Sequence, residues 1–252
     1  MINGMVVLIS GAAGRIGSSI SHGIIEEGGK VILVDPNEAG LDQITLGLSE
    51  ECFLTIAADA GIAEALDRCI AAGVEKFGHI DAAIHSAYPR SAGWGTPFEN
   101  LNQKFLNEDL SSHLGGAIIF SQRILEFFKQ QGHGNLIHVS SVLGVLAPKF
   151  ENYVGTKMTS PLEYTAIKSA LIAVTRYLAK YYKGNGIRVN CISPGGILDK
   201  QPESFLERYR SNCNDKGMLN ACDLVGTALY LLSAQSRYVT GQNLIVDDGW
   251  SL

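Results

Sequence analysis

The segment MVVLISGAAGRIG, residues 5–17, decides the fold. It begins as a short apolar run rich in β-branched residues, which is typical of a buried parallel strand. A turn with three glycines follows, and then a helix that we expect to reach about Glu27. Glycines let the backbone approach a pyrophosphate, and the amino end of a helix favours its negative charge. A plain strand-to-helix turn is the alternative, because a glycine motif alone is weak evidence.

An acidic residue ends the next expected strand, residues 30–34. Asp35 can accept hydrogen bonds from the adenosine ribose hydroxyls, and its charge repels a 2′-phosphate. Arg15 in the glycine turn has the opposite effect, since it can reach a phosphate. We give Asp35 more weight and expect NAD as the cofactor, with NADP as the alternative.

Strands and helices alternate along the rest of the chain. Further strands are expected at 53–57, 81–86, 135–139, 187–192 and 243–246, and further helices at 38–49, 62–77, 100–131, 161–183 and 223–233. This alternation predicts an α/β Rossmann fold, with a doubly wound parallel sheet of about seven strands and helices on both faces. No linker-like stretch divides the 252 residues, so we expect a single domain over 1–252.

Two stretches follow strands at the carboxyl edge of the sheet, where ligands bind in open α/β folds. Asp59 lies where an adenine edge can be bound, or alternatively it is the N-cap of the helix expected after Gly61. The stretch HSAYPR, residues 85–90, makes Tyr88 and Arg90 candidate substrate contacts. The alternative for that stretch is a surface loop punctuated by proline.

The helix PLEYTAIKSALIAVTRYLAKYYK, residues 161–183, carries candidate catalytic groups. Pro161 suits a helix start, and the many Ala and Leu residues favour helix. Tyr164 and Lys168 are four apart and therefore share one face. A neighbouring ammonium favours phenolate, so we expect a lowered Tyr164 pKa and acid–base chemistry near neutral pH. Taken alone, the pair can equally decorate a helix surface.

Composition excludes several classes of protein. The net charge of −5 argues against nucleic acid as a partner. The first ten residues lack the basic region of a signal peptide, and no apolar run is long enough to span a membrane. The five cysteines are odd in number and form no CxxC pair. We therefore expect a cytoplasmic protein with reduced thiols and no structural metal.

Eight pieces of the sequence together resemble the short-chain dehydrogenase/reductase family over nearly the whole chain. They are SGAAGRIG (10–17), Asp35, Asp59, HSAY (85–88), VSSVLG (139–144), YTAIK (164–168), RVNCISPGG (188–196) and TGQNLIVDDG (240–249). The resemblance implies that Tyr164 is the general acid and base, that Lys168 lowers its pKa and holds the nicotinamide ribose, and that Ser141 polarises the reacting oxygen. It also implies a set of cofactor-binding residues: Ser10, Gly11, Gly14, Arg15, Ile16, Gly17, Asp35, Asp59, Ala60, Ser86, Ala87, Tyr164, Lys168, Pro194, Gly195 and Ile197.

The chain departs from the family pattern in four places. Arg15 replaces the usual middle glycine, and His85-Ser86-Ala87-Tyr88 replaces Asn-Asn-Ala-Gly. His113 aligns with the family's proton-relay Asn; imidazole can hold a water and relay protons, or the residue can be a hydrogen-bonded packing residue. The interval from Ser141 to Tyr164 is longer than usual, and Tyr153 with Lys157 lies nearer the usual distance. We reject Tyr153, because Gly155 weakens a helix there and Pro161 prevents its continuation.

We expect loops at about 88–98, 145–162 and 196–222 to form the substrate site. Arg90 and Lys149 in these loops are candidates for binding an anionic, hydroxyl-rich substrate, with solvated surface charge as the alternative. The apolar faces of helices 116–129 and 165–182 resemble the family's dimer and tetramer surfaces, so we expect a homodimer or homotetramer. Trp250–Leu252 is expected to pack against a neighbouring subunit.

A narrower resemblance concerns the AYPR stretch, the APKFE loop and the ending IVDDGWSL. These are similar to oxidoreductases of bacterial flagellin-glycan and legionaminic-acid gene clusters. That resemblance implies a sugar, sugar phosphate or nucleotide sugar as substrate of an NAD(P)-dependent oxidoreductase. Two alternatives stay open: an epimerase or dehydratase that keeps its NAD bound, and a non-catalytic dinucleotide-binding protein.

Overall fold

The computed structural model describes residues 2–252 and contains one sheet of seven parallel strands. The strand order is β3-β2-β1-β4-β5-β6-β7, which is that of a doubly wound Rossmann fold. The strands are β1 Val6–Ser10, β2 Lys30–Asp35, β3 Phe53–Ala57, β4 Ala82–His85, β5 Gly134–Val139, β6 Ile187–Pro194 and β7 Asn243–Val246. The predicted fold class is therefore confirmed.

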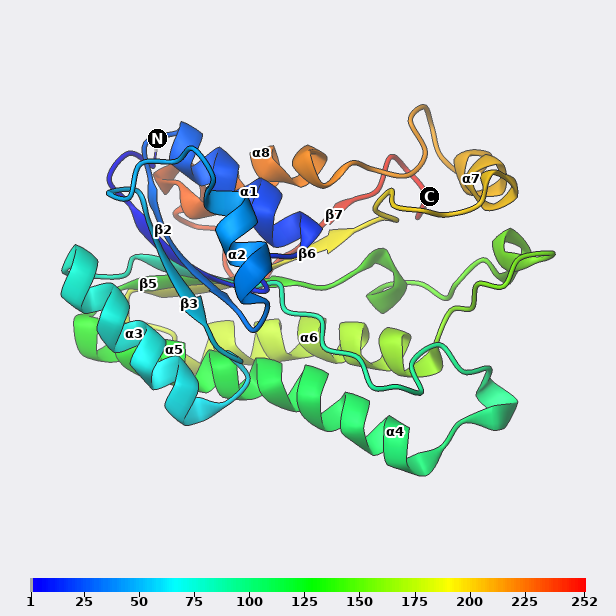
Figure 1. Cartoon of the computed structure of the whole chain (residues 1–252), viewed down its shortest axis with the longest axis horizontal. Coiled ribbons are helices and arrows are strands. Elements are labelled where there is room, and N and C mark those ends of the chain that lie inside the picture. Colours follow the sequence, from blue (N-terminus) through cyan, green and yellow to red (C-terminus); the bar gives the residue numbers. More distant parts are fainter. Residues whose placement is uncertain (1) are drawn as a thin grey trace.

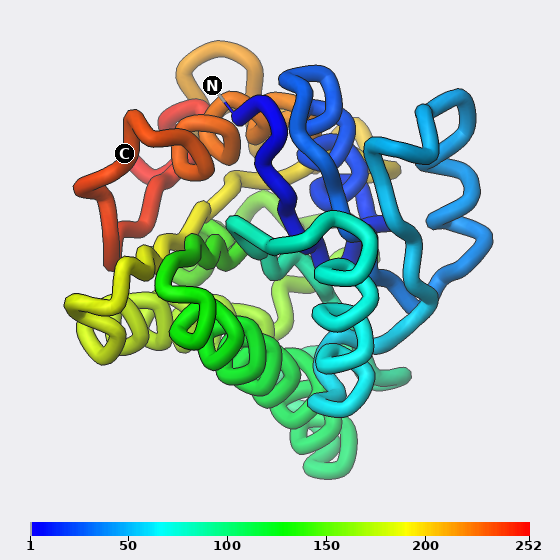
Figure 2. Tube along the Cα trace, turned by 90° about the vertical axis from the view of Figure 1, so that its left-hand side faces the viewer, coloured from blue at the N-terminus to red at the C-terminus, as the bar shows by residue number. Residues whose placement is uncertain are grey.

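Helices cover both faces of the sheet (Figure 1). One face carries α1 Arg15–Glu26, α2 Glu38–Thr45 and α8 Val225–Leu232; the other carries α3 Ala63–Phe77, α5 Gly116–Gln131 and α6 Leu162–Tyr181. Figure 2 shows α3 and α5 side by side, in cyan and green. The short helices α4 Gln103–Asp109 and α7 Glu203–Arg210 lie beyond the sheet.

The alternation within β1 explains the two cores. Val6 and Leu8 point to the side of α3 and α5, whereas Val7 and Ile9 point to the side of α1 and α8. All four side chains are almost fully buried. A strand with helices on both faces needs apolar residues at every position, which is the pattern of the opening segment.

Most element boundaries lie within three residues of the sequence-based expectation, and three larger differences occur. The helix expected at 38–49 ends at Thr45, because Gly47 adopts φ +80°. The helix expected at 100–131 contains a π-helical segment, Leu110–Gly115, between α4 and α5. Helix α7 was not predicted at all; Phe205 and Tyr209, four apart and buried in an otherwise charged segment, are the signal that indicates it.

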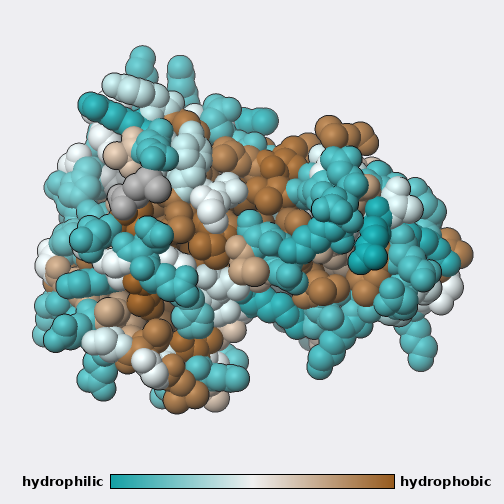
Figure 3. All heavy atoms as spheres, turned by 90° about the horizontal axis from the view of Figure 1, so that it is seen from above, coloured by the Kyte–Doolittle hydropathy of each residue, from teal (hydrophilic) through white to brown (hydrophobic). Residues whose placement is uncertain are grey.

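The carboxyl ends of the strands all meet at one edge, where the long loops gather beside α7 (Figure 1). Seen from above, hydrophilic side chains form most of the outline of the molecule, and hydrophobic ones gather in the middle of that face (Figure 3). Within residues 2–252, no helix is both long and apolar enough to cross a membrane.

Candidate active site

A cavity of about 760 Å³ lies at the carboxyl edge of the sheet. The glycine turn and Asp35 line one end, and the ends of β5 and α6 line the middle. Residues of the three expected substrate loops, including Tyr88, Tyr153 and Tyr209, line the other end. One cavity therefore contains the residues expected to bind the cofactor and the loops expected to bind the substrate.

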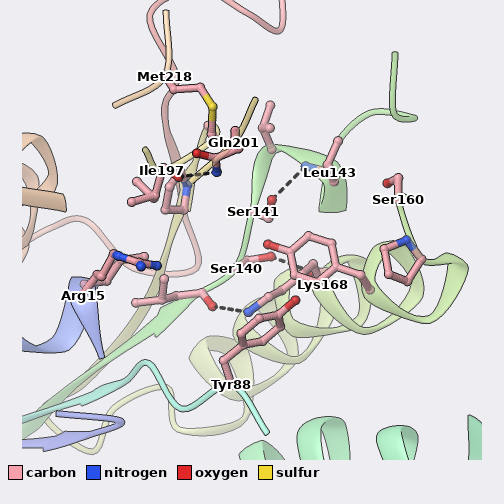
Figure 4. A pocket seen from close by; sticks show the side chains of 18 of the residues that line it. Arg15, Tyr88, Ser140, Ser141, Leu143, Ser160, Lys168, Ile197, Gln201 and Met218 are labelled. Carbon is pink, nitrogen blue, oxygen red and sulfur yellow. Dashed lines mark hydrogen bonds between the residues drawn. The ribbon is translucent and has the colours of Figure 1, made fainter. Parts of the chain in front are cut away.

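Ser141, Tyr164 and Lys168 meet in the middle of this cavity. Ser141 follows β5 and caps a short 3₁₀ turn, where its Oγ accepts a hydrogen bond from the Leu143 N–H at 3.2 Å (Figure 4). Ser140 Oγ donates to the Lys168 carbonyl at 2.6 Å and joins β5 to α6. This bond holds Ser141 and the catalytic helix in a defined relation.

Tyr164, and not Tyr153, shares a helix with the candidate lysine. Helix α6 begins only at Leu162, with Pro161 in extended conformation before it. Tyr153 ends a separate 3₁₀ turn and packs against Phe205, with the ring centroids 5.2 Å apart. Gly155 has φ +75°, so no helix runs on from Tyr153.

The pKa of Tyr164 is raised and not lowered, so the expected lowering is wrong. Burial raises the pKa of Tyr164, and its hydrogen bond with Ser141 opposes this only in part. Lys168 Nζ lies 5.7 Å from the centre of the Tyr164 ring and donates instead to the Val139 carbonyl at 3.0 Å. Burial lowers the pKa of Lys168 itself to about 8. Desolvation therefore sets the direction of the Tyr164 pKa shift, while the Lys168 ammonium is turned toward the backbone.

The glycine turn has the shape that a dinucleotide requires. Gly11 adopts φ +68°, and a Cβ there would lie 2.7 Å from Ala87 Cα. A Cβ on Gly17 would lie 2.2 Å from the Gly11 carbonyl oxygen. Helix α1 begins after Gly14 without a side-chain cap, so the N–H groups of its first turn stay available to an anion. These residues fit a dinucleotide pyrophosphate.

Asp35 and Arg15 line the same end of the cavity. The Asp35 carboxylate accepts hydrogen bonds from the Ala13 N–H at 3.1 Å and from the Asn37 N–H at 2.9 Å. Arg15 forms an ion pair with Asp199, which follows β6 in the third substrate loop. The carboxylate is therefore fixed beside the turn, and part of the Arg15 charge is already neutralised.

The remaining cofactor candidates lie around this turn. Asp59 and Ala60 line a smaller cavity of about 200 Å³ together with Asp35 and Ala87. The N-cap position of α3 is Ile62, whose side chain makes no capping hydrogen bond. Asp59 instead accepts a hydrogen bond from the Gly61 N–H, so its alternative role as the helix cap is wrong. Ser86 Oγ donates to the Ser10 carbonyl at 2.7 Å. The main cavity is also lined by Ile16 of the turn itself and by Pro194, Gly195 and Ile197.

Three buried histidines surround Lys168. His113 lies in the π-helical segment with 0% exposure, and neither ring nitrogen has a hydrogen-bond partner among the described residues. Burial, followed by the charge of Lys168, lowers the pKa of both His113, to about 2, and His138, to about 4. His85 shows the same direction, and its Nδ1 also lacks a partner within residues 2–252. All three rings are therefore neutral near pH 7.

The substrate end is aromatic. The Tyr88 ring contacts those of Trp94, His113 and Tyr164, with centroids 5.4, 5.1 and 5.6 Å apart. Lys168 Nζ lies 5.6 Å from the centre of the Tyr88 ring, and the two side chains adjoin in Figure 4. Tyr88 thus fills the space that a glycine leaves open in the family pattern.

Two expectations about this end need correction. Lys149 does not line the cavity: its ammonium donates to Asn212 Oδ1 at 3.1 Å and to the Trp250 carbonyl at 3.0 Å, so it ties the loop to the segment after α7 and to the C-terminal segment. Trp250 is 2% exposed and stacks on Tyr209 within the same chain. Trp250 therefore has little surface left for a neighbouring subunit, whereas Leu252, the last residue of the expected contact, is 96% exposed.

Sequence reasoning also missed part of the cavity wall. These lining residues come from all three loops and from the C-terminal segment: Trp94, Met158, Thr159, Ser160, Gln201, Phe205, Met218 and Trp250. Of these residues, only Phe205 could have been found from the sequence, through its four-residue spacing to Tyr209 in α7. The others lie in loops whose course depends on tertiary contacts.

Comparison with known proteins agrees with this geometry. The profile of the family described as Enoyl-(Acyl carrier protein) reductase matches residues 11–251. Post-translational flagellin modification protein A of Campylobacter coli is 42% identical over 256 residues, covering 100% of both chains. The 7alpha-hydroxysteroid dehydrogenase of Bacteroides fragilis is 26% identical, covering 98% of this chain and 94% of its own.

A solved structure extends the comparison. The short chain dehydrogenase of Leptospira borgpetersenii with bound NAD+ is 31% identical and has a TM-score of 0.87, with 100% of this chain and 94% of that chain covered. The extent of these matches, together with the Ser141, Tyr164 and Lys168 cluster beside the glycine turn, leads to one conclusion. The chain is a nicotinamide-dependent oxidoreductase and belongs to the short-chain dehydrogenase/reductase family.

Proposed function

We propose that the protein moves a hydride between NAD and a secondary alcohol or ketone of a sugar-like molecule. The observation that carries the proposal is the meeting of Ser141, Tyr164 and Lys168 between the glycine turn and an aromatic substrate end in one cavity. When bound, the nicotinamide accepts or supplies the hydride. The glycine turn and Asp35 would hold its adenosine and pyrophosphate half, and Pro194, Gly195 and Ile197 would lie beside its reactive half.

The chain's own groups manage the proton. The Tyr164 phenolate takes the proton of the substrate alcohol during oxidation, and the Tyr164 hydroxyl donates a proton to the carbonyl oxygen during reduction. Ser141 donates a hydrogen bond to the same oxygen and stabilises the charge that develops there. The Lys168 side chain turns from the Val139 carbonyl toward the ligand in this proposal. Its positive charge then lies beside Tyr164 and favours the phenolate.

Asp35 selects NAD over NADP in this proposal. Its carboxylate is fixed by two backbone N–H groups, and Asp199 partly neutralises Arg15, the group able to attract a 2′-phosphate. Replacing Asp35 by Ser should therefore shift the ratio of Kd values toward NADP by about 10-fold or more, because a charge repulsion is removed. Titrating all four nicotinamide cofactors by thermal shift measures this. Unchanged preference in the variant would contradict the role of Asp35.

His113 relays protons between Lys168 and solvent in this proposal. Its two unpartnered buried nitrogens support the role, since such groups need a hydrogen-bond partner such as an ordered water. His113→Leu should lower kcat by roughly tenfold and enlarge the solvent isotope effect, while His113→Asn restores most of the rate. Because the pKa of His113 is about 2, its ring stays neutral between pH 6 and 7. Any change of rate in that range should therefore be the same in the wild type and in His113→Asn. Equal rates in the Leu variant would reduce His113 to a packing residue.

The setting we propose is glycan biosynthesis in the cytoplasm. The name of the Campylobacter coli relative refers to flagellin modification, and the aromatic and hydroxyl-bearing cavity wall suits a sugar. We further propose a homodimer or homotetramer, because Ile118 of α5 and Tyr177 and Tyr181 of α6 are 44%, 66% and 67% exposed.

One experiment tests the whole proposal. Purified protein is incubated with NAD and a panel of sugars, sugar phosphates and nucleotide sugars, and both nicotinamide absorbance and product mass are followed. Net NADH with a product two hydrogens lighter is expected. An isomeric or dehydrated product without net NADH would instead identify an epimerase or dehydratase. Cofactor binding without any turnover across the panel would indicate a binding protein.

A further inference from the structure

The substrate end of the cavity contains one charged side chain without a charged partner. Arg90 lines the cavity, and its guanidinium carbon lies 5.2 Å from the centre of the Tyr88 ring. No hydrogen bond or ion pair joins Arg90 to any other residue in 2–252. A guanidinium stacked on an aromatic ring keeps the N–H groups at its edge free, so it can still bind a carboxylate or phosphate in bidentate fashion.

Two other cations of the substrate loops are already bound to groups of the protein. Lys149 is bound to Asn212 and Trp250, and Arg208 donates to the Val154 carbonyl. The single acidic side chain among the lining residues of the described chain is Asp35, at the cofactor end. A substrate group that reaches Arg90 therefore meets no acid among the residues that line this end of the cavity, and buried Lys168 adds positive charge. Two buried acids outside the lining act nearby: Asp109 accepts hydrogen bonds from Ser91, and the charge of Glu163 adds to the effect of burial in raising the pKa of Tyr88.

The path from Arg90 to the reacting hydroxyl is aromatic. Arg90 lies on the Tyr88 ring, and Tyr88 contacts both Tyr164 and Trp94 edge to face. Along this wall the chain offers flat apolar faces, while Thr159 and Asn152 supply a hydroxyl and an amide. Such a wall suits a ring with hydroxyl groups on its rim and C–H groups on its faces.

We infer that the substrate is a hydroxylated ring bearing an anionic group, and that Arg90 binds that anion while Tyr88 and Trp94 pack against the ring. This inference rests on the proposed oxidoreductase function, because it fixes the reacting carbon at Tyr164. A carboxylate and a phosphate share the required chemistry. Arg90 is a binding residue in this account and takes no part in proton transfer.

The test uses binding to the complex of the full chain with NADH. The probes are a hexuronate, the parent hexose, a hexose 6-phosphate and a UDP-hexose, each titrated by thermal shift. At least one anionic probe should bind about 10–100-fold more tightly than the neutral hexose, the range expected for hydrogen bonds to a charged group. The probe that binds best distinguishes a carboxylate from a phosphate, and added salt should reduce the difference.

Variants assign the effect to Arg90. Arg90→Gln should remove the preference for the anionic probe and leave NADH binding unchanged, and Arg90→Lys should keep part of it. Arg237→Gln is the matched control, because Arg237 also lies over a tyrosine ring, Tyr238, at 5.3 Å, and does not line the cavity. Equal or absent binding of the anionic probes to the NADH complex, or an Arg90→Gln variant that binds like the wild type, overturns the inference. Failure of NADH itself to bind would instead remove the proposed function.

Discussion

Replacing Tyr164 by Phe is expected to lower kcat by about 10²–10⁴-fold, the usual contribution of a positioned acid–base group. The variant loses one hydroxyl and keeps the ring that contacts Tyr88 and Trp94, so the aromatic wall should stay intact. Affinity for NAD should change little, because the glycine turn and Asp35 carry that binding. Steady-state kinetics on the best substrate of the panel, with a parallel thermal-shift titration of NAD, measures both quantities.

Tyr153→Phe is the matched control for this experiment. Tyr153 also lines the cavity, and burial raises the pKa of its hydroxyl. It lies outside the catalytic helix and packs on Phe205 through its ring, which the substitution preserves. We expect rates within a few-fold of the wild type. A large loss in Tyr153→Phe together with a near-normal Tyr164→Phe would reverse the assignment of the catalytic tyrosine.

Replacing Lys168 by Met is expected to lower kcat by at least about 10²-fold and, at the same time, to stabilise the protein. Lys168 is 5% exposed, and its pKa falls from 10.5 to about 8. Each unit corresponds to about 1.4 kcal/mol, so keeping the buried ammonium charged costs roughly 3 kcal/mol. Loss of the hydrogen bond to the Val139 carbonyl offsets about 1 kcal/mol. A net gain of about 2 kcal/mol in the free energy of unfolding at pH 7 should remain.

The pH dependence of this gain follows from linkage. The folded protein releases the Lys168 proton near pH 8, whereas the unfolded chain holds it to about pH 10.5. The cost in the wild type is therefore complete below pH 8 and disappears as the pH rises to 10.5. Chemical denaturation of both proteins across this range should show the gap closing. Lys180→Met, at an exposed position of the same helix, should leave stability nearly unchanged. A Lys168→Met variant that is less stable than the wild type at pH 7 would show that burial of the charge is not costly.

The order of strands and helices follows from local sequence. Apolar β-branched runs such as Val6–Ser10 can be buried on both faces only in a parallel sheet, and the glycine turn after them admits few shapes. The choice of Tyr164 over Tyr153 was equally local, because Gly155 and Pro161 act on the backbone around them. These features depend on neighbours in the chain, and they were therefore readable without a structure.

The chemistry of the site depends on contacts between distant segments. Lys168 and Tyr164 share a helix face, yet burial beneath β5 and the Val139 carbonyl sets the direction of the lysine and both pKa values. Lys149 and Arg90 look alike as loop cations, and only tertiary contacts bind one to Trp250 and leave the other on Tyr88 facing the cavity. By itself, the sequence determined the fold and the family, and it named Ser141, Tyr164 and Lys168 as the candidate reacting groups. Only the tertiary structure decided the direction of the Tyr164 and Lys168 pKa shifts and which loop cation lines the cavity, because desolvation and partner choice arise only when remote segments pack together.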